Sequence, residues 1–348
     1  MPRKLHVVAA VLVDGAGRVL IAQRPPGKSL AGAWEFPGGK LHAFETRLAG
    51  LQRELEEELG IQVESARPLI RYRHEYPDLE VDLDVWRVTR WSGEPHGREG
   101  QALAWHDPVE LHAVGLLPAD AVIVNALRLP AIMLVTPAAA PEGESGFLDT
   151  LEAYAESCRH RGPPGQPGPQ EPQGPPLVCL RRPDLDPVAL LELAAGAACR
   201  LDGTGVRLLL HGEPVRLAPL ILDPPARLRA RLGDVVAGLH VPARFLPGLT
   251  RRPVPDDLWF GVSCRDAAEL KTAAQVGADY AFLGNVLPTA SHPGQPGLGW
   301  ETFAERVADL PLPVYGIGGL GPADLDAAWA AGAQGIAAIR GLWPSSSG

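Results

Sequence analysis

Residues 34–61, WEFPGGKLHAFETRLAGLQRELEEELGI, contain the pattern that determines the fold and the chemistry of the first third of the chain. Leucines recur every three or four residues in the second half of this stretch, which predicts a helix over Thr46–Leu59. Glu54, Glu57 and Glu58 are spaced i, i+3 and i+4, so they share one face of that helix, opposite the leucines. The stretch therefore predicts a helix that is packed on one side and strongly acidic on the other.

The three carboxylates repel one another unless a cation lies among them. Hard oxygen ligands of this kind select Mg2+ or Mn2+, and such a metal can bridge phosphate oxygens and activate a water molecule. A solvated acidic helix face is the alternative interpretation. The preceding pair Gly38-Gly39, which lets backbone approach a metal or a phosphate closely, favours the metal site.

Three residues outside the helix extend this candidate site. Lys40 follows the glycine pair and can face phosphate charge, and Arg24 ends a predicted strand from which it can reach phosphate or nucleoside. Glu99 lies in the glycine-rich loop Gly97–Gly100, where it can be a further metal ligand or a base. We therefore expect a phosphate-handling site built from several segments.

The stretch Gly39-x5-Glu45-x7-Arg53-Glu54 and the residues after it match every fixed position of the Nudix box. From about residue 4 to residue 129 the chain resembles the MutT branch of that family, which hydrolyses 8-oxo-dGTP to the monophosphate and pyrophosphate. The resemblance implies an α/β/α sandwich with a mixed sheet, in which either Glu54 or Glu99 orients the attacking water. It implies metal ligands at the Gly38 carbonyl, Glu54, Glu57, Glu58 and Glu99, and a nucleotide site lined by Arg24, Glu35, Phe36, Pro37, Gly38 and Asp120.

Two positions depart from that family. The loop residue Phe44 stands where the family usually has glycine, which affects the loop but no ligand. Asp120 stands where MutT proteins carry an asparagine that reads the oxidised guanine. An ionised aspartate only accepts hydrogen bonds, whereas asparagine donates and accepts, so a protonated Asp120 is needed to take the same role.

The remaining elements of the first part read as mixed strand and helix. Val7–Val13 and Val19–Gln23 flank the turn signal Asp14–Gly17, which predicts a hairpin. Val81–Val88 alternates apolar and polar residues as a half-buried strand does, and Ala119–Leu129 predicts a closing helix.

The rest of the chain alternates short apolar runs with Ala- and Leu-rich stretches, which predicts a parallel (β/α)8 barrel. The eight candidate strands are Ile132–Val135, Leu177–Leu180, Val206–Leu210, Val235–Leu239, Trp259–Val262, Tyr280–Leu283, Val314–Ile317 and Ile336–Ile339. A Pro/Gly-rich segment at about 159–176 is predicted to be disordered. It is either the linker between domains or an insertion after the helix Phe147–Glu156. The strand count favours an insertion, with domains over residues 1–129 and 131–343.

Residues 131–343 resemble thiamine phosphate synthase and the related thiazole tautomerase, through motifs such as Gly261-Val262-Ser263 and Gly316–Gly319. Several charged positions of those families are missing. Pro183 replaces a lysine, His211-Gly212 replace Asn-Asp, no acid follows His240, and Arg265 stands near the expected tautomerase histidine. Without those charges, chemistry on a metal-bound pyrophosphate lacks support. We expect a ligand-sensing or structural barrel, with Gly318-Gly319 as either a phosphate loop or a tight turn.

The bulk composition limits the remaining possibilities. A net charge of −9 without a long basic cluster argues against direct binding of duplex DNA. No apolar run is long enough for a membrane span, and four scattered cysteines suit reduced thiols in a cytoplasmic protein. The sequence thus predicts a Mg2+-dependent enzyme that removes 8-oxo-dGTP and so prevents mutation. The alternatives are another nucleotide substrate, or a bifunctional protein whose barrel makes or senses thiamine phosphates.

Overall fold

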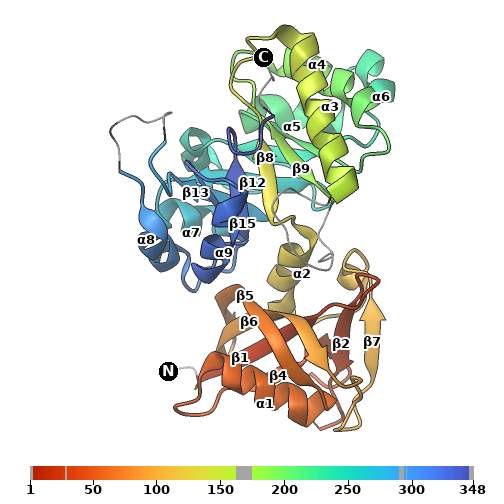
Figure 1. Ribbon diagram of the computed structural model, residues 1–348, viewed down its shortest axis with the longest axis vertical. Coiled ribbons are helices and arrows are strands. Elements are labelled where there is room, and N and C mark those ends of the chain that lie inside the picture. The colour runs from red at the N-terminus through yellow and green to blue at the C-terminus, as the bar shows by residue number, and fades with distance from the viewer. Residues whose placement is uncertain (1–2, 28–29, 162–174, 290–293, 295, 345–348) are drawn as a thin grey trace. The chain divides into compact units, whose positions relative to one another are not determined.

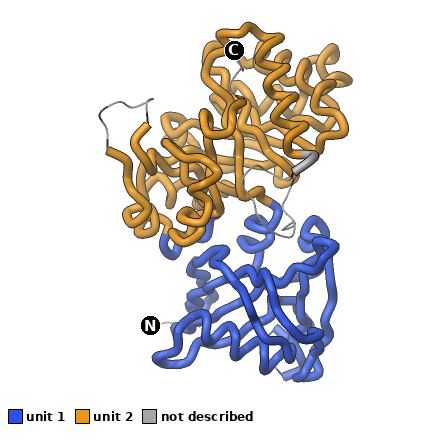
Figure 2. Tube along the Cα trace, in the orientation of Figure 1, with its two compact units in different colours: residues 1–128, 169–173, 308–313 blue, residues 129–168, 174–307, 314–348 orange. Residues whose placement is uncertain are grey.

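The computed structural model describes residues 3–27, 30–161, 175–289, 294 and 296–344, and the chain divides into two compact units (Figure 1). The first consists mainly of residues 1–128 and the second mainly of residues 129–307 and 314–348 (Figure 2). Most of the predicted Pro/Gly insertion lies outside the described residues. Across those ranges, no helix is both long enough and apolar enough to cross a membrane.

The first unit contains two sheets, a four-stranded one with the order β4-β1-β6-β5 and a three-stranded one with the order β3-β2-β7. Strand β1 runs parallel to β6 and antiparallel to β4, so the larger sheet is mixed, as predicted. The strands are β1 (Arg3–Leu12), β2 (Val19–Gln23), β3 (Trp34–Glu35), β4 (Gly38–Lys40), β5 (Gln62–Tyr76), β6 (Leu79–Ser92) and β7 (Leu103–His106). The helices are α1 (Arg47–Leu59), η1 (Leu111–Ala113), η2 (Pro118–Asp120) and α2 (Ala121–Arg128).

The predicted hairpin between β1 and β2 is wrong. The turn itself forms, because the Gly17 amide donates to the Asp14 carbonyl over 3.0 Å. Beyond one bridge between Val13 and Val19, however, the two strands enter different sheets. Both edges of β1 are already paired, with β4 and β6, so no edge remains for β2.

Helix α1 begins and ends where the pattern predicts. The Thr46 hydroxyl accepts a hydrogen bond from the Ala49 amide over 3.2 Å and caps the first turn, and Gly60 ends the helix at φ +73°. Leu51, Leu55 and Leu59 are fully buried in a cluster with apolar residues of β1 and β5. The leucine stripe therefore fixes which face of the helix the glutamates present.

The second unit is a closed barrel of eight parallel strands, and all eight predicted runs form them. The strands are β8 (Ile132–Val135), β9 (Leu177–Leu180), β10 (Arg207–His211), β11 (Val236–Val241), β12 (Trp259–Cys264), β13 (Tyr280–Gly284), β14 (Val314–Ile317) and β15 (Gly335–Ala338). The intervening helices are α3 (Gly143–Arg161), α4 (Pro187–Leu201), α5 (Pro214–Leu222), α6 (Ala226–Leu232), η3 (Ala243–Gly248), α7 (Ala267–Gln275), α8 (Gly299–Val307), η4 (Pro322–Asp324) and α9 (Leu325–Ala330).

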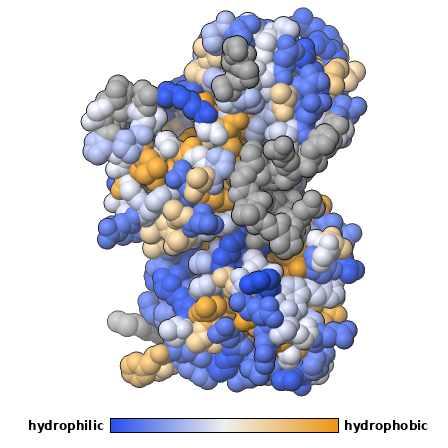
Figure 3. All heavy atoms as spheres, viewed as in Figure 1, coloured by the Kyte–Doolittle hydropathy of each residue, from blue (hydrophilic) through white to orange (hydrophobic). Residues whose placement is uncertain are grey.

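The interiors of both units are mainly apolar, with a few buried polar side chains such as Asp120 and His240. In the barrel, Tyr280, Phe282 and Tyr315 fill the centre together with smaller aliphatic side chains. On the face drawn in Figure 3, hydrophilic side chains cover most of the first unit. All four cysteines are free thiols, and three of them are buried.

Candidate active site

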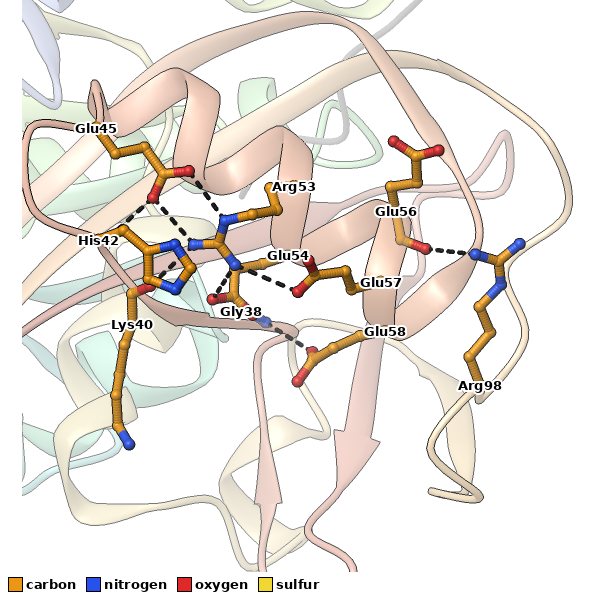
Figure 4. A network of polar contacts seen from close by, with 10 residues as sticks. All are labelled: Gly38, Lys40, His42, Glu45, Arg53, Glu54, Glu56, Glu57, Glu58 and Arg98. Atoms are coloured by element: carbon orange, nitrogen blue, oxygen red, sulfur yellow. Dashed lines mark hydrogen bonds and ion pairs between the residues drawn. The ribbon is translucent and has the colours of Figure 1, made fainter.

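Arg53 stands at the centre of the acidic face of α1 (Figure 4). Its Nε and Nη2 donate to the two carboxylate oxygens of Glu45 over 2.9 and 3.0 Å, and Nη2 also donates to the Lys40 carbonyl. Its Nη1 donates to Glu54 over 2.8 Å and to Glu57 over 3.3 Å. This guanidinium lowers the pKa of Glu45 to about 2. Arg53 thus supplies positive charge among these acids and fixes the loop that precedes the helix.

The glycine pair brings the β4 loop against the helix. A side chain on Gly39 would place its Cβ 2.2 Å from a Glu54 carboxylate oxygen, and one on Gly38 would place its Cβ 2.1 Å from the Val8 carbonyl. The Gly38 amide donates to the Glu58 carboxylate over 3.2 Å. Glycine is therefore required at both positions for β4 to pair with β1 while Glu54 and Glu58 lie against its backbone.

The loop that carries Glu99 is bound to the carboxyl end of α1. The His96 amide donates to the Leu59 carbonyl and Arg98 Nη1 donates to the Glu56 carbonyl, each at about 3 Å. Gln101 Nε2 donates to the Glu58 carbonyl and its Oε1 accepts from the Glu99 amide. These bonds satisfy the terminal carbonyls of the helix and so place Glu99 at the helix end that carries Glu58.

Three of the predicted nucleotide-binding residues, Arg24, Glu35 and Phe36, lie near Asp120. Arg24 and Glu35 form an ion pair, and the Phe36 amide donates to the Asp120 carboxyl. Asp120 is 4% exposed, and within the described chain its Oδ2 has no hydrogen-bond partner. Burial, aided by the charge of Glu35, raises the pKa of Asp120 well above its ordinary value. The predicted base-reading position therefore holds a buried carboxyl group with a raised pKa and one oxygen that has no hydrogen-bond partner among the described residues.

Two tyrosines of β5 support this cluster, and the sequence reasoning did not assign them a role. Tyr72 is fully buried and donates from its hydroxyl to the Ala119 carbonyl over 2.6 Å, which fixes the backbone beside Asp120. Tyr76 also contacts the Ala119 backbone, and burial raises the pKa of both tyrosines. Their spacing in the sequence could have indicated a shared role, because residues i and i+4 of a strand point to the same face.

Two predicted site residues lie apart from this arrangement. The Lys40 side chain is exposed and points away from the glutamates (Figure 4). The Glu57 side chain is 61% exposed and turns toward Arg53. Accordingly, over the part of the chain that the structure describes, no three His, Cys, Asp or Glu side chains are grouped closely enough to hold a metal ion.

The carboxyl ends of the barrel strands have a different chemistry. Arg181 follows β9, His211 ends β10, Arg244 follows β11 and Ser263 lies near the end of β12. For all eight strands, neither the last residue nor the one after it is Asp or Glu. The missing acids that the sequence indicated are therefore not replaced by others at the strand ends.

The Gly318-Gly319 loop forms a tight turn after β14. Both glycines have positive φ values, +99° and +73°, which disfavour other residues. A Cβ on Gly318 would lie 2.8 Å from the Asn285 Cα, and one on Gly319 would lie 2.7 Å from the Pro288 carbonyl. The close packing of backbone against backbone accounts for both glycines, whether or not the loop also binds phosphate.

Comparison with known proteins agrees with this architecture. Residues 8–126 match the NUDIX domain family and residues 134–342 match the thiamine monophosphate synthase family. An 8-oxo-dGTP diphosphatase from Haemophilus influenzae is 38% identical over 123 residues, which are 35% of this chain and 90% of that protein. The chain belongs to both families.

Two further relatives bear on substrate and on the barrel. A CTP pyrophosphohydrolase from Escherichia coli is 36% identical to the NUDIX unit over 123 residues, 35% of this chain and 91% of the relative. A putative thiamine-phosphate synthase from Geobacter sulfurreducens is 30% identical over 168 residues, 47% of this chain and 72% of the relative. Both resemblances expected from the sequence are confirmed, and relatives of the NUDIX unit are named for purine and for pyrimidine nucleotides.

The residues of the NUDIX unit fit the divalent metal that its family requires. The available donors are carboxylate and carbonyl oxygens, the ligand type that hard divalent cations prefer. Gly39 leaves space for the Glu54 carboxylate directly against the loop backbone. Among the described residues, the exposed Glu57 carboxylate pairs with Arg53 over 3.3 Å. Its side chain would have to rotate toward Glu54 and Glu58 before the three carboxylates could hold a metal, at the cost of one weak ion pair.

Proposed function

We propose that this protein hydrolyses 8-oxo-dGTP and related oxidised purine nucleoside triphosphates to the monophosphate and pyrophosphate. The observation that carries the proposal is the buried Asp120, whose Oδ2 has no hydrogen-bond partner among the described residues. It lies near the Arg24–Glu35 pair, in the same unit as the acidic face of α1. The named activities of its NUDIX relatives support a pyrophosphohydrolase. Removal of oxidised nucleotides from the cytoplasmic pool would prevent their incorporation into DNA.

In this proposal Mg2+, which Mn2+ can replace, is held by the Gly38 carbonyl and by Glu54, Glu57, Glu58 and Glu99. When bound, the metal neutralises phosphate charge and lowers the barrier to attack by water. Either Glu54 or Glu99 orients the water and takes its proton. Lys40, whose exposed side chain is long and flexible, turns toward the phosphates when substrate is present.

Base recognition rests on the protonation of Asp120. A neutral carboxyl group donates one hydrogen bond and accepts others, as the asparagine of the MutT branch does. The Phe36 amide already occupies one carboxyl oxygen, so Oδ2 is the atom left to contact the base. Arg24, Glu35, Phe36 and Pro37 line the same nucleotide site.

The test is a substrate panel with purified protein and Mg2+, in which 8-oxo-dGTP, dGTP, CTP and ADP-ribose are compared by kcat/KM. We expect clear preference for 8-oxo-dGTP over dGTP. Preference for CTP would retain the pyrophosphohydrolase and replace its substrate, and an absence of hydrolysis of every nucleotide would overturn the proposal.

For the barrel we infer a second role, the binding of a thiamine-type phosphate without its synthesis. Its membership of the thiamine monophosphate synthase family supports a phosphorylated ligand. Strand ends without Asp or Glu argue against synthesis, because pyrophosphate release in such a site needs a bound metal. Synthase activity in a coupled assay would overturn this assignment.

A further inference from the structure

Three side chains from neighbouring strands form a line of hydrogen bonds inside the barrel. The Tyr280 hydroxyl lies 3.0 Å from His240 Nδ1, and His240 Nε2 lies 2.8 Å from the Ser263 hydroxyl. Tyr280 and His240 are fully buried, whereas Ser263 is only partly buried. Gly261 makes the line possible, because a Cβ there would lie 2.1 Å from the Tyr280 ring.

Burial determines where the hydrogens of this line lie. It raises the pKa of Tyr280, so the phenol keeps its hydrogen, and it lowers the pKa of His240, so the imidazole is neutral. Within the described residues the Tyr280 hydroxyl has no acceptor other than His240 Nδ1, so it donates there. The single N–H of the imidazole is then on Nε2 and donates to Ser263.

The hydrogen of Ser263 is therefore directed away from His240. This excludes Ser263 as a nucleophile activated by His240, because Nε2 already carries a hydrogen and cannot accept another as a base. What remains is a hydroxyl donor whose direction is set by two buried residues. Such a donor suits an anionic ligand at the carboxyl ends of the strands.

Positive charge surrounds the same place. His211 lies at the end of β10 and its ring stacks on His240 with centroids 5.6 Å apart. Burial, together with the charges of the nearby Arg181 and Arg244, lowers the pKa of His211 to about 4. Across the described ranges, neither Arg181 nor Arg244 forms an ion pair with a carboxylate.

The divalent metal that the synthase family implies does not fit these residues. The acids that follow β9 and β12 are engaged. Asp184 pairs with Arg182. Asp266 accepts from the Glu269 amide and caps α7, and Glu269 pairs with Arg265. After β10 the first acid is Glu213, which precedes α5. Arginines beside the strand ends would repel a cation, so the metal has neither ligands nor a favourable field there.

We propose that the carboxyl ends of β9–β12 bind the phosphate group of a phosphate monoester directly, without a divalent metal. Arg181 and Arg244 supply the positive charge, and Ser263, oriented by His240 and Tyr280, donates a hydrogen bond to a phosphate oxygen. Ser263 and the two arginines are binding residues, whereas His240 and Tyr280 are positioning residues. This inference rests on the ligand-binding role proposed for the barrel.

Calorimetric titration of the full chain with thiamine monophosphate and with inorganic phosphate, in buffer containing EDTA, tests the inference. We expect binding in EDTA that Ser263→Ala weakens about tenfold and Arg181→Gln weakens further. Ser157→Ala is the matched control, because that hydroxyl donates to the Tyr154 carbonyl within α3. Thermal unfolding followed by circular dichroism verifies that each variant is folded.

Tyr280→Phe tests the line of hydrogen bonds independently. Without the phenol hydrogen, His240 Nδ1 no longer accepts a hydrogen bond. We expect the 15N chemical shifts of His240 to report a change of tautomer, and calorimetry to show weaker binding. Unchanged shifts, or Ser263→Ala binding like the wild type, would overturn the role of the line. Binding only after Mg2+ is added would overturn the metal independence and leave the ligand-binding role intact, whereas no binding of either probe in any buffer would overturn both.

Discussion

In the NUDIX unit three glutamates bind one arginine, whereas at the barrel strand ends two arginines have no carboxylate partner within the described chain. The two regions address the same problem, the handling of phosphate, with opposite charge. An acidic site needs a cation between it and a phosphate, and a basic site can contact the phosphate directly. The sign of the side chains thus predicts whether each unit depends on metal.

Removing divalent metal is the sharpest way to break this comparison. We expect EDTA to abolish nucleotide hydrolysis completely, because the carboxylates of α1 repel phosphate without a metal. Mg2+ should restore hydrolysis in a pyrophosphate-release assay. Hydrolysis that persists in EDTA would contradict the role of the acidic face in binding metal. Neither unit would then need a divalent metal, and the contrast between them would be lost.

A single charge on α1 should have the next largest effect. Glu57→Gln keeps the shape of the side chain and removes its charge, and we expect kcat for 8-oxo-dGTP to fall about 100-fold or more. Glu56→Gln, one residue away on a different face, is the control and should hydrolyse at the wild-type rate. Equal rates in the two variants would mean that Glu57 binds no metal, and matched melting temperatures would exclude unfolding as the cause.

The glycine loop tests whether position matters as much as charge. In Gly39→Ala the new Cβ would meet the Glu54 carboxylate at 2.2 Å, so we expect the carboxylate to move and kcat/KM to fall about 10- to 100-fold. Gly15→Ala is the matched control, because nothing lies within 4 Å of a Cβ there. A Gly39→Ala enzyme with normal kcat/KM would show that Glu54 need not touch the loop.

Asp120 and His240 are both buried ionisable groups. Each ring nitrogen of His240 has a hydrogen-bond partner, whereas Oδ2 of Asp120 has none among the described residues. Because burial raises the pKa of Asp120, its carboxyl hydrogen is lost as the pH rises, and base recognition should weaken in that direction. Stability follows the same sign: the contribution of neutral Asp120 is present at low pH and is lost as pH rises through its raised pKa.

Asp120→Asn cannot ionise and separates this effect from other titrations. We divide the kcat/KM of the variant on 8-oxo-dGTP by that of the wild type at each pH. We expect this ratio to rise about tenfold from mildly acidic to alkaline pH, because the wild type loses about one hydrogen bond to the base when Asp120 ionises. The free energy of unfolding of the variant should likewise gain on the wild type at alkaline pH. A ratio that stays flat with pH would mean that Asp120 is ionised throughout or does not contact the base.

The sequence predicts periodic features better than contacts between distant segments. The Leu stripe of α1 and the eight barrel runs are local repeats, and the structure has both. The hairpin at Asp14–Gly17 failed because strand pairing depends on which edges other strands occupy, which a turn motif does not contain.

Within the candidate site, the acidic face followed from spacing, but the part played by Arg53 did not. The Arg53 guanidinium contacts Glu45, eight residues earlier, and the carbonyl of Lys40. Both contacts depend on how the loop before the helix folds. Tyr72 was missed for the same reason, since it meets Ala119 only when β5 packs beside η2. The line from Tyr280 to Ser263 likewise needs three strands in register.

The smallest effect concerns the loop before the acidic helix. Phe44 has φ +66° and its side chain is fully exposed, so it bears the cost of a left-handed conformation without burying its ring. Phe44→Gly should therefore raise the free energy of unfolding by about 1 kcal/mol, offset in part by the greater freedom of glycine when unfolded. Phe44→Ala, which removes the ring but keeps the Cβ, is the control and should gain nothing. Chemical denaturation measures the free energy of unfolding of both variants. If Phe44→Ala stabilises the protein as much as Phe44→Gly does, then the exposed ring, and not the left-handed backbone conformation, destabilises the wild type.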